Sequence, residues 1–483
     1  MNTEELKRLT VAETLRLLRA GKVTSAELVR GLLEIMESSQ QDIHAFVTID
    51  AEGALRQAAE CDARRAAGED LPLLGVPIAI KDNMNVIGQP CTASSRILEG
   101  YVAPYDATVI AKLRAAGAIF LGRTNMDEFA LGSTTQTSAF GPTENPIARG
   151  CIPGGSSGGS AAAVGGGLAI CALGSDTGGS IRQPASHCGI VGVKPTYGRV
   201  SRYGVVACAS SLDQVGPMTK TVEDAALILN VISGRDPMDA TCLDEAVPDY
   251  TQAWAGADPE KPLAGMRIGL PKEYFGEGLD PEVRARVEAA AERARALGAE
   301  TVEVSLPHSG YGIPTYYICM TAELSANLAR FDGVRYGLRV PCDDVIAQYG
   351  ATRAEGFGAE VKRRVLLGTF VLSSGFYDAY YNRAQKVRTL IRRDLEAAFA
   401  RCDLLLGPVT PEPAWPLGVY QNDPIRNYLS DVLTVAANLA GCCALSLPAG
   451  KTGEGKPVGV QLIGPNFGEM ALFRAAHALE CRG

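Results

Sequence analysis

Short apolar runs alternate with amphipathic stretches along most of the chain. Such runs are typical of buried strands, and we expect strands at 74–80, 118–122, 168–173, 266–270, 300–306, 403–408, 443–447 and 458–464. The stretches between them predict helices, which we expect at 106–116, 161–166, 221–233, 281–297, 314–330, across 359–398 and after about 468. This alternation predicts an α/β protein with a largely parallel or mixed sheet covered by helices.

The first forty residues are also predicted to be helical. Thr24 and Glu27 form a capping box, in which two side chains satisfy free N–H groups at a helix start. This box opens a helix that runs through about Glu37. Asp106 has the residue type of an N-cap and stands at the start of the helix predicted over 106–116.

The length of the chain allows several domains or one large one. At roughly 150 residues per domain, 483 residues would make about three. The polar stretch 234–261 is the best linker candidate, but the apolar strands on both sides can belong to one sheet. We therefore expect a single large domain over 1–483.

Composition and charge narrow the classes of function. The chain has 46 Lys and Arg against 54 Asp and Glu, a net charge of -8. A protein that binds nucleic acid by itself usually carries an excess of positive charge, so we do not expect this chain to bind nucleic acid on its own. Glycine makes up about 11% of the residues against a usual ~7%, which indicates loops whose backbone has a role.

Neither the cysteines nor the apolar stretches suggest a metal site or a membrane span. The thirteen cysteines include no C-x-x-C pair, so we expect buried apolar side chains in a reducing compartment. The acidic N-terminus lacks the plan of a signal peptide. The uncharged stretches 150–175 and 432–450 are broken by Pro, Gly, Ser or Asn. We expect a soluble cytoplasmic protein that binds no metal.

Two loops rich in glycine and serine carry the strongest chemical signal. One reads Pro-Gly-Gly-Ser-Ser-Gly-Gly-Ser over 153–160, and the other reads Gly-Ser-Asp-Thr-Gly-Gly-Ser-Ile-Arg-Gln-Pro over 174–184. Glycine lets successive backbone N–H groups converge on a phosphate or on the oxyanion of a reacting carbonyl. Neither loop has the lysine of a phosphate-binding loop. The oxyanion interpretation therefore leads, with Ser180 as the candidate nucleophile.

A nucleophilic serine needs a base, and the histidines are poor candidates. Residues 155–159 formally match G-x-S-x-G, with His308 and His477 later in the chain. That motif should directly follow a strand, whereas here it follows loop residues. His187 lies in an apolar setting soon after Ser180, where we expect a packed core or tunnel-wall residue. A Ser–His–Asp hydrolase therefore stays a minor alternative.

Lys81 is the better candidate for the base. It ends the apolar strand predicted over 74–80, and burial there would disfavour its charged form and lower its pKa. A neutral amine can take a proton from a hydroxyl. A strand-end lysine is most often a surface residue when taken alone. Its combination with the two serine loops favours the catalytic role.

Together these segments resemble the amidase signature family. The resemblance rests on Gly75–Asn83, Gly154–Ser160 and Gly178–Pro184. It implies the fold of that family, a large mixed sheet between layers of helices. Three parts of the single domain follow from it: a helical N-terminal part at about 1–65, a catalytic core at about 66–235 and a substrate-pocket part at about 262–483.

The resemblance also implies a Ser–cis-Ser–Lys triad. Ser180 would attack an amide carbonyl, Ser156 would relay the proton from a cis peptide setting, and Lys81 would be the final base. Ser157 and Ser160 would be structural, packing the loop and capping its helix. The oxyanion hole would be formed by the N–H groups of Thr177, Gly178, Gly179 and Ser180.

Further segments are similar to one branch of that family, the glutaminase subunits of tRNA-dependent amidotransferases. They are 122–129, 201–205, 210–217, 330–336, 356–358, 362–364 and 373–379. This branch implies hydrolysis of glutamine and transfer of ammonia to one of two further subunits in a heterotrimer. That partner would amidate misacylated Glu-tRNA(Gln), Asp-tRNA(Asn) or both, using ATP and Mg²⁺. This chain itself would hold no cofactor and would meet tRNA mainly through the partner.

The same resemblance places substrate contacts at Tyr316, Arg364 and Asp431. Chemically, Arg364 can bind the α-carboxylate of glutamine, Asp431 the α-ammonium group, and Tyr316 can add a hydroxyl contact. A free-standing amidase that hydrolyses small aryl or acyl amides is the alternative, and it would lack the Arg364 and Asp431 pair. The chain departs from the branch at Arg123, usually Lys, and at His187, usually aromatic.

Overall fold

A computed structural model describes residues 1–420 and 423–481. Residues 421–422 and 482–483, which belong to the predicted C-terminal part, lie outside this description. The described strands are β1 (Phe46–Ile49), β2 (Pro77–Lys81), β3 (Ile119–Thr124), β4 (Cys171–Asp176), β5 (Val191–Lys194), β6 (Gln214–Thr219), β7 (Arg267–Pro271), β8 (Glu300–Val304), β9 (Leu404–Pro408), β10 (Ala444–Lys451) and β11 (Pro457–Ile463).

These strands form one sheet in the order β1-β3-β2-β4-β6-β5-β10-β11-β9-β7-β8. β2 lies between β3 and β4 and is parallel to both, whereas β4 and β6 are antiparallel. The prediction of an α/β protein with a mixed sheet is therefore confirmed. Because β2 and β4 are parallel, their carboxyl ends lie at the same edge of the sheet.

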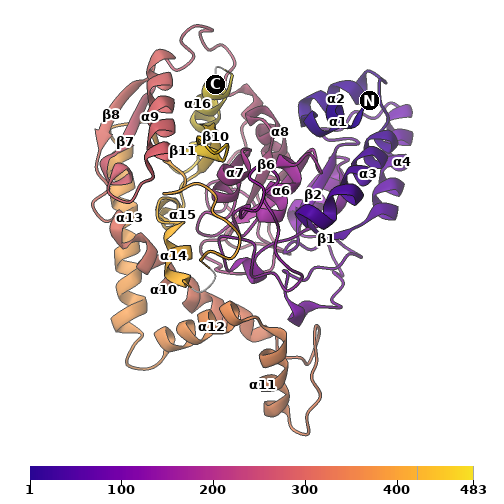
Figure 1. Ribbon diagram of the computed structural model, residues 1–483, viewed down its shortest axis with the longest axis vertical. Helices are drawn as coiled ribbons and strands as arrows, with labels where there is room; N and C mark the ends of the chain where they lie inside the picture. Colours follow the sequence, from indigo (N-terminus) through magenta and orange to yellow (C-terminus); the bar gives the residue numbers. More distant parts are fainter. Residues whose placement is uncertain (421–422, 482–483) are drawn as a thin grey trace.

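The described helices cover the sheet and extend beyond it (Figure 1). They are α1 (Thr3–Arg8), α2 (Val11–Arg19), α3 (Ser25–Ile43), α4 (Ala51–Ala66), α5 (Thr108–Ala115), α6 (Gly158–Gly165), α7 (Arg182–Cys188), α8 (Val222–Ile232), α9 (Pro281–Ala296), α10 (Gly312–Asn327), α11 (Val345–Gly356), α12 (Ala359–Leu372), α13 (Arg383–Phe399), α14 (Pro424–Leu429), α15 (Val435–Ala440) and α16 (Glu469–Glu480).

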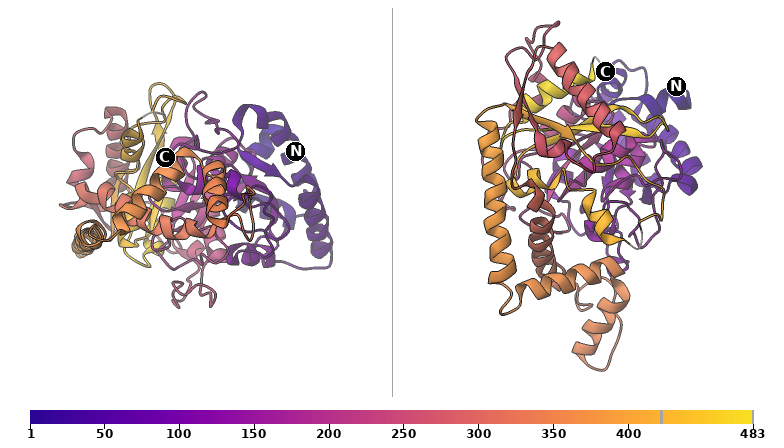
Figure 2. Two further views of the ribbon diagram at one scale, coloured as in Figure 1. Left: turned by 90° about the horizontal axis from the view of Figure 1, so that it is seen from below. Right: turned by 60° about the vertical axis from the view of Figure 1, so that its left-hand side comes forward.

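Figures 1 and 2 show how these helices are arranged. The first four lie beside the β1 edge of the sheet, and α9 lies at the opposite edge beside β7 and β8. Helices α11 and α12 extend away from the layered body, below the long helix α13. None of the helices within residues 1–420 and 423–481 is both long and apolar enough to cross a membrane.

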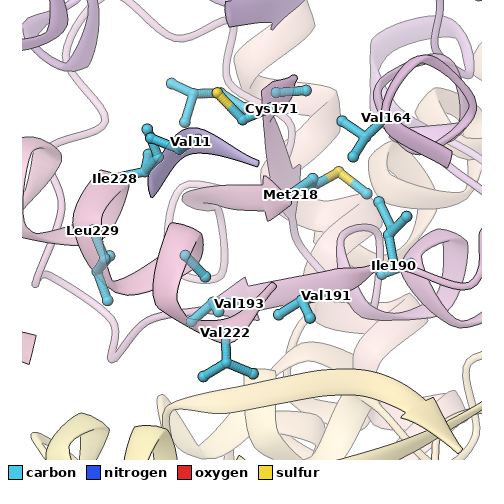
Figure 3. Packing of buried hydrophobic residues seen from close by; sticks show 14 of the residues in the cluster. Val11, Val164, Cys171, Ile190, Val191, Val193, Met218, Val222, Ile228 and Leu229 are labelled. Atoms are coloured by element: carbon cyan, nitrogen blue, oxygen red, sulfur yellow. The ribbon is translucent and has the colours of Figure 1, made fainter. Parts of the chain in front are cut away.

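The main apolar core supports the middle of the sheet. Val191 and Val193 of β5 are fully buried and cluster with Met218 of β6 and with Val222 and Leu229 of α8 (Figure 3). Branched side chains of this kind fit the pleated surface of a sheet, and their burial is the main favourable contribution to folding. This core holds the strands whose ends carry the candidate site.

Some predicted boundaries were wrong. The strand expected over 168–173 runs over Cys171–Asp176, because apolar composition does not show where pairing starts and stops. Asp106 is not the N-cap of α5, because Ala107 takes that position. The Asp106 carboxylate instead accepts a hydrogen bond from the Ile87 N–H group and forms an ion pair with Arg114. The capping box of Thr24 and Glu27 is confirmed, at the start of α3.

The apolar pattern also missed whole elements. β1, β5, β6 and helix α4 have no counterpart among the predicted elements. Two of these strands contain glycine, and β6 contains proline as well. Both residue types are typical of turns, so the sequence of β5 and β6 does not predict strands. Pairing with neighbouring strands in the sheet stabilises them instead.

Candidate active site

Lys81 is the last residue of β2, and its side chain is completely buried. Its Nζ atom donates to Ser156 Oγ at 2.7 Å, to Ser157 Oγ at 2.8 Å and to Ser175 Oγ at 2.9 Å. The parallel pairing of β2 with β4 brings the lysine next to Ser175 at one edge of the sheet. The amine is thus held by the sheet on one side and by the serine loop on the other.

The environment of Lys81 favours its neutral form. Burial lowers the pKa of Lys81 to about 7, although the carboxylates of Asp127 and Asp176 oppose this by favouring the charged form. A substantial part of the population is therefore neutral at pH 7. A neutral amine at hydrogen-bond distance from a serine hydroxyl has the chemistry of a general base.

Ser156 lies in a tightly packed loop before α6. The Gly155–Ser156 peptide bond is cis, which is the setting that the family resemblance implied. A Cβ atom added at Gly155 would lie 2.1 Å from Asp127 Oδ2, so no larger residue fits there. The Gly155 N–H group also donates to Gln183 Oε1 at 2.8 Å. These contacts fix the position from which Ser156 reaches Lys81.

Neither Ser157 nor Ser160 caps the start of helix α6. Helix α6 begins at Gly158, and Ser157, its N-cap residue, makes no side-chain capping bond. Instead, Ser157 Oγ accepts a bond from Lys81 and donates to the Ser175 carbonyl at 3.1 Å. Ser160 lies within α6; its Oγ atom is 2.7 Å from Thr124 Oγ1 and donates to the Leu173 carbonyl at 2.9 Å, so it ties the helix to the sheet instead of packing the loop. Ser157 therefore belongs to the surroundings of the amine.

Ser180 lies in the loop between β4 and α7. It is 6% exposed, and its hydroxyl group hydrogen-bonds no residue of the part that the structure describes, Ser156 included. Within the same described residues, the N–H groups of the Thr177–Ser180 segment have no acceptor. Four free N–H groups close to a serine hydroxyl are the donors that an oxyanion hole needs.

A buried ion pair closes this loop at its base. Asp176 Oδ2 accepts bonds from the Ile181 N–H group at 3.2 Å and from Arg182 Nε at 3.1 Å, and both charged side chains are completely buried. Burial alone would raise the pKa of Asp176, but Arg182, together with Lys194 and the hydrogen bond from Asn438, outweighs it and lowers that pKa to about 2. The pair ties the end of β4 to the start of α7, so the nucleophile loop has fixed ends.

Two residues of the predicted substrate set lie against the nucleophile loop. A Cβ atom added at Gly178 would be 2.8 Å from the Tyr316 ring, and one added at Gly179 would be 3.2 Å from Asp431 Oδ1. Gly179 has a φ of 147°, which favours glycine as well. The Tyr316 ring leaves no room for a side chain at Gly178, and Thr434 Oγ1, 2.4 Å from a Cβ atom at Gly179, leaves none there, so the loop lies directly against Tyr316 and close to Asp431.

Asp431 has one oxygen atom ready for a ligand. Ser133 Oγ donates to Asp431 Oδ2 at 2.7 Å, whereas Oδ1 is buried and has no partner among the described residues. Burial raises the pKa of Asp431 to about 7, against the opposing effect of the Ser133 hydrogen bond. A buried carboxylate oxygen without a partner is costly, and a cationic group in the site would satisfy it.

Arg364 lines a cavity of about 360 Å³ that Ser133, Glu360 and Tyr428 also line. Its side chain is almost fully buried, and its guanidinium carbon lies 5.1 Å from the centre of the Tyr428 ring. Because Ser133 also bonds to Asp431, which lies against Gly179, one residue connects the cavity to the nucleophile loop. Of the predicted substrate residues, Arg364 lines this cavity, Asp431 is linked to it through Ser133, and Tyr316 lies against the nucleophile loop.

The sequence comparisons decide the family. The profile of the family described as Amidase matches residues 27–473. The chain belongs to the amidase family. It is 52% identical over 477 residues to a protein of Geobacter metallireducens named as a subunit of glutamyl-tRNA(Gln) amidotransferase, covering 99% of this chain and 97% of that one. It is 54% identical to a protein of the same name from Roseiflexus sp., covering 98% and 96%.

Solved structures of the amidase family agree with the fold. The corresponding glutamyl-tRNA(Gln) amidotransferase subunit of Thermotoga maritima has a TM-score of 0.80 and 41% identity, covering 98% of this chain and 95% of that one. The peptide amidase of Stenotrophomonas maltophilia has a TM-score of 0.83 and 33% identity, covering 98% and 97%. Proteins with different names share this fold, so the fold by itself does not distinguish an amidotransferase subunit from a peptide amidase.

The two residues that depart from the branch lie in different surroundings in this amidase-family chain. Arg123 is buried, pairs with Asp82 at 3.4 Å and donates to the Lys81 carbonyl at 3.1 Å, so it supports the backbone of the candidate base. His187 is buried edge-on against Trp415, and burial lowers its pKa to about 4. His187 is therefore buried, as the sequence indicated.

Four residues near the site were missed by sequence reasoning: Ser133, Ser175, Glu360 and Tyr428. Ser175 could have been found, because it directly follows an apolar run that ends in a loop with the nucleophile. Glu360 stands four residues before Arg364, a spacing that predicts an ion pair on a helix, so it could have been found as well. Ser133 and Tyr428 carry no local signal, because only the fold brings them to the cavity lined by Arg364. No group of three or more His, Cys, Asp or Glu residues suited to a metal ion gathers within the described ranges.

Proposed function

We propose that this chain is the glutaminase subunit of a tRNA-dependent amidotransferase. The proposal is supported by the relatives named as glutamyl-tRNA(Gln) amidotransferase subunits, which match it at 52% and 54% identity over nearly the whole chain. The observation that carries it is chemical. A buried lysine is bonded to serines, Arg364 lines a cavity with Ser133, and Ser133 bonds to Asp431, whose other carboxylate oxygen has no partner among the described residues.

In the proposed reaction, Ser180 Oγ attacks the side-chain amide carbonyl of glutamine. Ser156 takes the proton from Ser180 and passes its own proton to the neutral Lys81 amine, which lies 2.7 Å away. The free N–H groups of the loop hold the oxyanion. Collapse breaks the C–N bond, and the nitrogen leaves as ammonia with the proton returned through Ser156. Water then hydrolyses the glutamyl ester on Ser180 by the same proton route and releases glutamate.

The charged ends of glutamine would be held away from the reacting amide. The Arg364 guanidinium can bind the α-carboxylate through two parallel hydrogen bonds, and Asp431 Oδ1 can accept from the α-ammonium group. The Tyr316 hydroxyl can add a contact close to the loop. Two contacts of opposite charge would select a zwitterionic amino acid over a simple amide.

The released ammonia would be used by a partner subunit. In this proposal two further subunits complete a heterotrimer, and one of them binds ATP, Mg²⁺ and tRNA and amidates misacylated Glu-tRNA(Gln). The negative charge of this chain suits a subunit that leaves most tRNA contacts to its partner. The amidation joins carbon to nitrogen with glutamine as the amide donor.

The test is an assay of the assembled complex with two nitrogen donors. Ser180→Ala should abolish glutamine-dependent amidation and leave ammonium-dependent amidation within about twofold of the wild type, because the amidation chemistry lies on the partner. Gel filtration confirms that the variant still assembles. Equal loss of both activities in an assembled complex would contradict the assignment of Ser180.

A free-standing amidase is the second candidate, since the peptide amidase structure has a TM-score of 0.83. Such an enzyme would hydrolyse neutral amides efficiently without partners. The chain by itself, assayed with glutamine and with a small neutral amide, separates the two functions. A preference for the neutral amide would support the second candidate.

A further inference from the structure

Glu360 lies one helical turn before Arg364 on α12, and its carboxylate is fully engaged. Glu360 Oε1 accepts from Arg364 Nε at 2.7 Å and from the Tyr428 hydroxyl at 2.7 Å. Its second oxygen pairs with Arg363. The side chain is only 13% exposed, so these partners replace the water that a carboxylate would otherwise bind.

The contact with Glu360 occupies Nε of Arg364 and leaves the edge with the two terminal nitrogens of the guanidinium group free. Nε is the only nitrogen atom of Arg364 with a hydrogen-bond partner among the described residues. The rings of Tyr317 and Tyr428 lie at 5.0 and 5.1 Å from the guanidinium carbon and restrict its plane. A guanidinium group is rigid and planar, so fixing Nε also fixes the direction of the two terminal nitrogens.

Those two nitrogens form the edge that binds a carboxylate through two parallel bonds. The side chains of Arg364, Glu360 and Tyr428 all line the cavity that contains Ser133. Four rotatable bonds would let an unsupported arginine take many orientations, and most of them would not present this edge. The ion pair with Glu360 also compensates the buried guanidinium charge before any substrate arrives.

We propose that Glu360 is a positioning residue that aims the terminal nitrogens of Arg364 at the α-carboxylate of the substrate. The proposal rests on the proposed function, in which Arg364 binds that carboxylate. Glu360 acts through Arg364 and touches no reacting atom. Its loss should therefore weaken binding of glutamine and leave the chemical step nearly unchanged.

The test uses the assembled complex with glutamine as substrate. Glu360→Ala should raise the KM for glutamine about tenfold, since an aimed charge-assisted contact is lost, with kcat within about twofold. Glu360→Gln keeps the size and an acceptor but not the charge, and it should raise KM about threefold. In the Arg364→Ala background, the further change Glu360→Ala should alter KM by less than about twofold, because the arginine that Glu360 positions is already absent.

A matched control is present on the neighbouring helix. Arg392 and Glu396 of α13 form an ion pair with the same spacing, at 3.3 Å, and both are more than half exposed. Glu396→Ala should leave KM and kcat unchanged. Thermal unfolding of each variant identifies structural damage, and if Glu360→Ala fails to fold, Glu360→Gln decides the outcome.

Three results would overturn the positioning role: an unchanged KM in Glu360→Gln, an equal loss of kcat and kcat/KM, or additive effects with Arg364→Ala. In each of these cases a raised KM in Arg364→Ala would leave the proposed function intact. An unchanged KM in Arg364→Ala itself would instead remove Arg364 from the glutamine site. The two failures are therefore distinguishable.

Discussion

Lys81 Nζ lies 2.7 Å from Ser156 Oγ, although 75 positions separate the two residues in the chain. Both side chains are completely buried. The contact exists because a strand end and a glycine-rich loop meet at one edge of the sheet. It places the Lys81 amine, whose pKa is lowered, against the hydroxyl group of Ser156, where the amine can act as a base.

Lys81→Arg should lower kcat/KM for glutamine by at least about a hundredfold. A guanidinium group keeps the positive charge and the donors but cannot take a proton, and a general base contributes about 10²- to 10⁴-fold. Steady-state glutaminase assays measure the effect, and ammonium-dependent amidation by the same complex is the control. Wild-type glutaminase activity in Lys81→Arg would make Lys81 only a structural cation.

The pH dependence of kcat/KM should differ between glutamine and a small neutral amide. The proposed reaction needs neutral Lys81 and ionised Asp431, and both have a pKa of about 7. Both requirements are met as pH rises, so kcat/KM for glutamine should increase steeply up to about pH 7, with a logarithmic slope near two. The neutral amide does not need Asp431, and its slope should be near one. Equal slopes for the two substrates would contradict the role of Asp431.

Arg364→Ala and Asp431→Asn should each damage the use of glutamine selectively. A charge-assisted contact is worth about 1.5–3 kcal/mol, which corresponds to roughly a ten- to hundredfold fall in kcat/KM. A small neutral amide makes neither contact, so its slow hydrolysis should fall much less. Both substrates are assayed with each variant after a folding check. A parallel fall on both substrates would indicate structural damage instead.

Arg182→Ala should destabilise the fold by about 3–5 kcal/mol, because it leaves the buried Asp176 carboxylate without its cation. The matched control is Arg235→Ala, which breaks an exposed pair with Asp244 and should cost less than about 1 kcal/mol. Urea denaturation gives both values. A change in Arg182→Ala as small as that of the control would contradict the structural role of the buried pair.

The parts of the site that the sequence predicts are those with a local signal. Lys81 ends an apolar run, and Ser156 and Ser180 lie in glycine-rich loops, so each could be named before the fold was seen. Ser133 and Tyr428 act through partners that are remote in the chain, and no local pattern marks them. The spacing of Glu360 and Arg364 is a local signal, but their place beside Tyr428 is not. The α/β class followed from alternation, whereas β5 and β6 are stabilised mainly by neighbouring strands.

The hydrogen bond from Ser133 to Asp431 joins residues that are 298 positions apart. The amine, the two serines and the loop that faces them come from residues 81–180, whereas Tyr316, Arg364 and Asp431 come from the later half of the chain. In the proposed mechanism the groups that break the amide bond come from the earlier stretch of the gene, and most groups that recognise the substrate come from the later one, with Ser133 linking the two. Mutation of the later stretch would then change which amide is accepted while the proton-transfer groups stay in place.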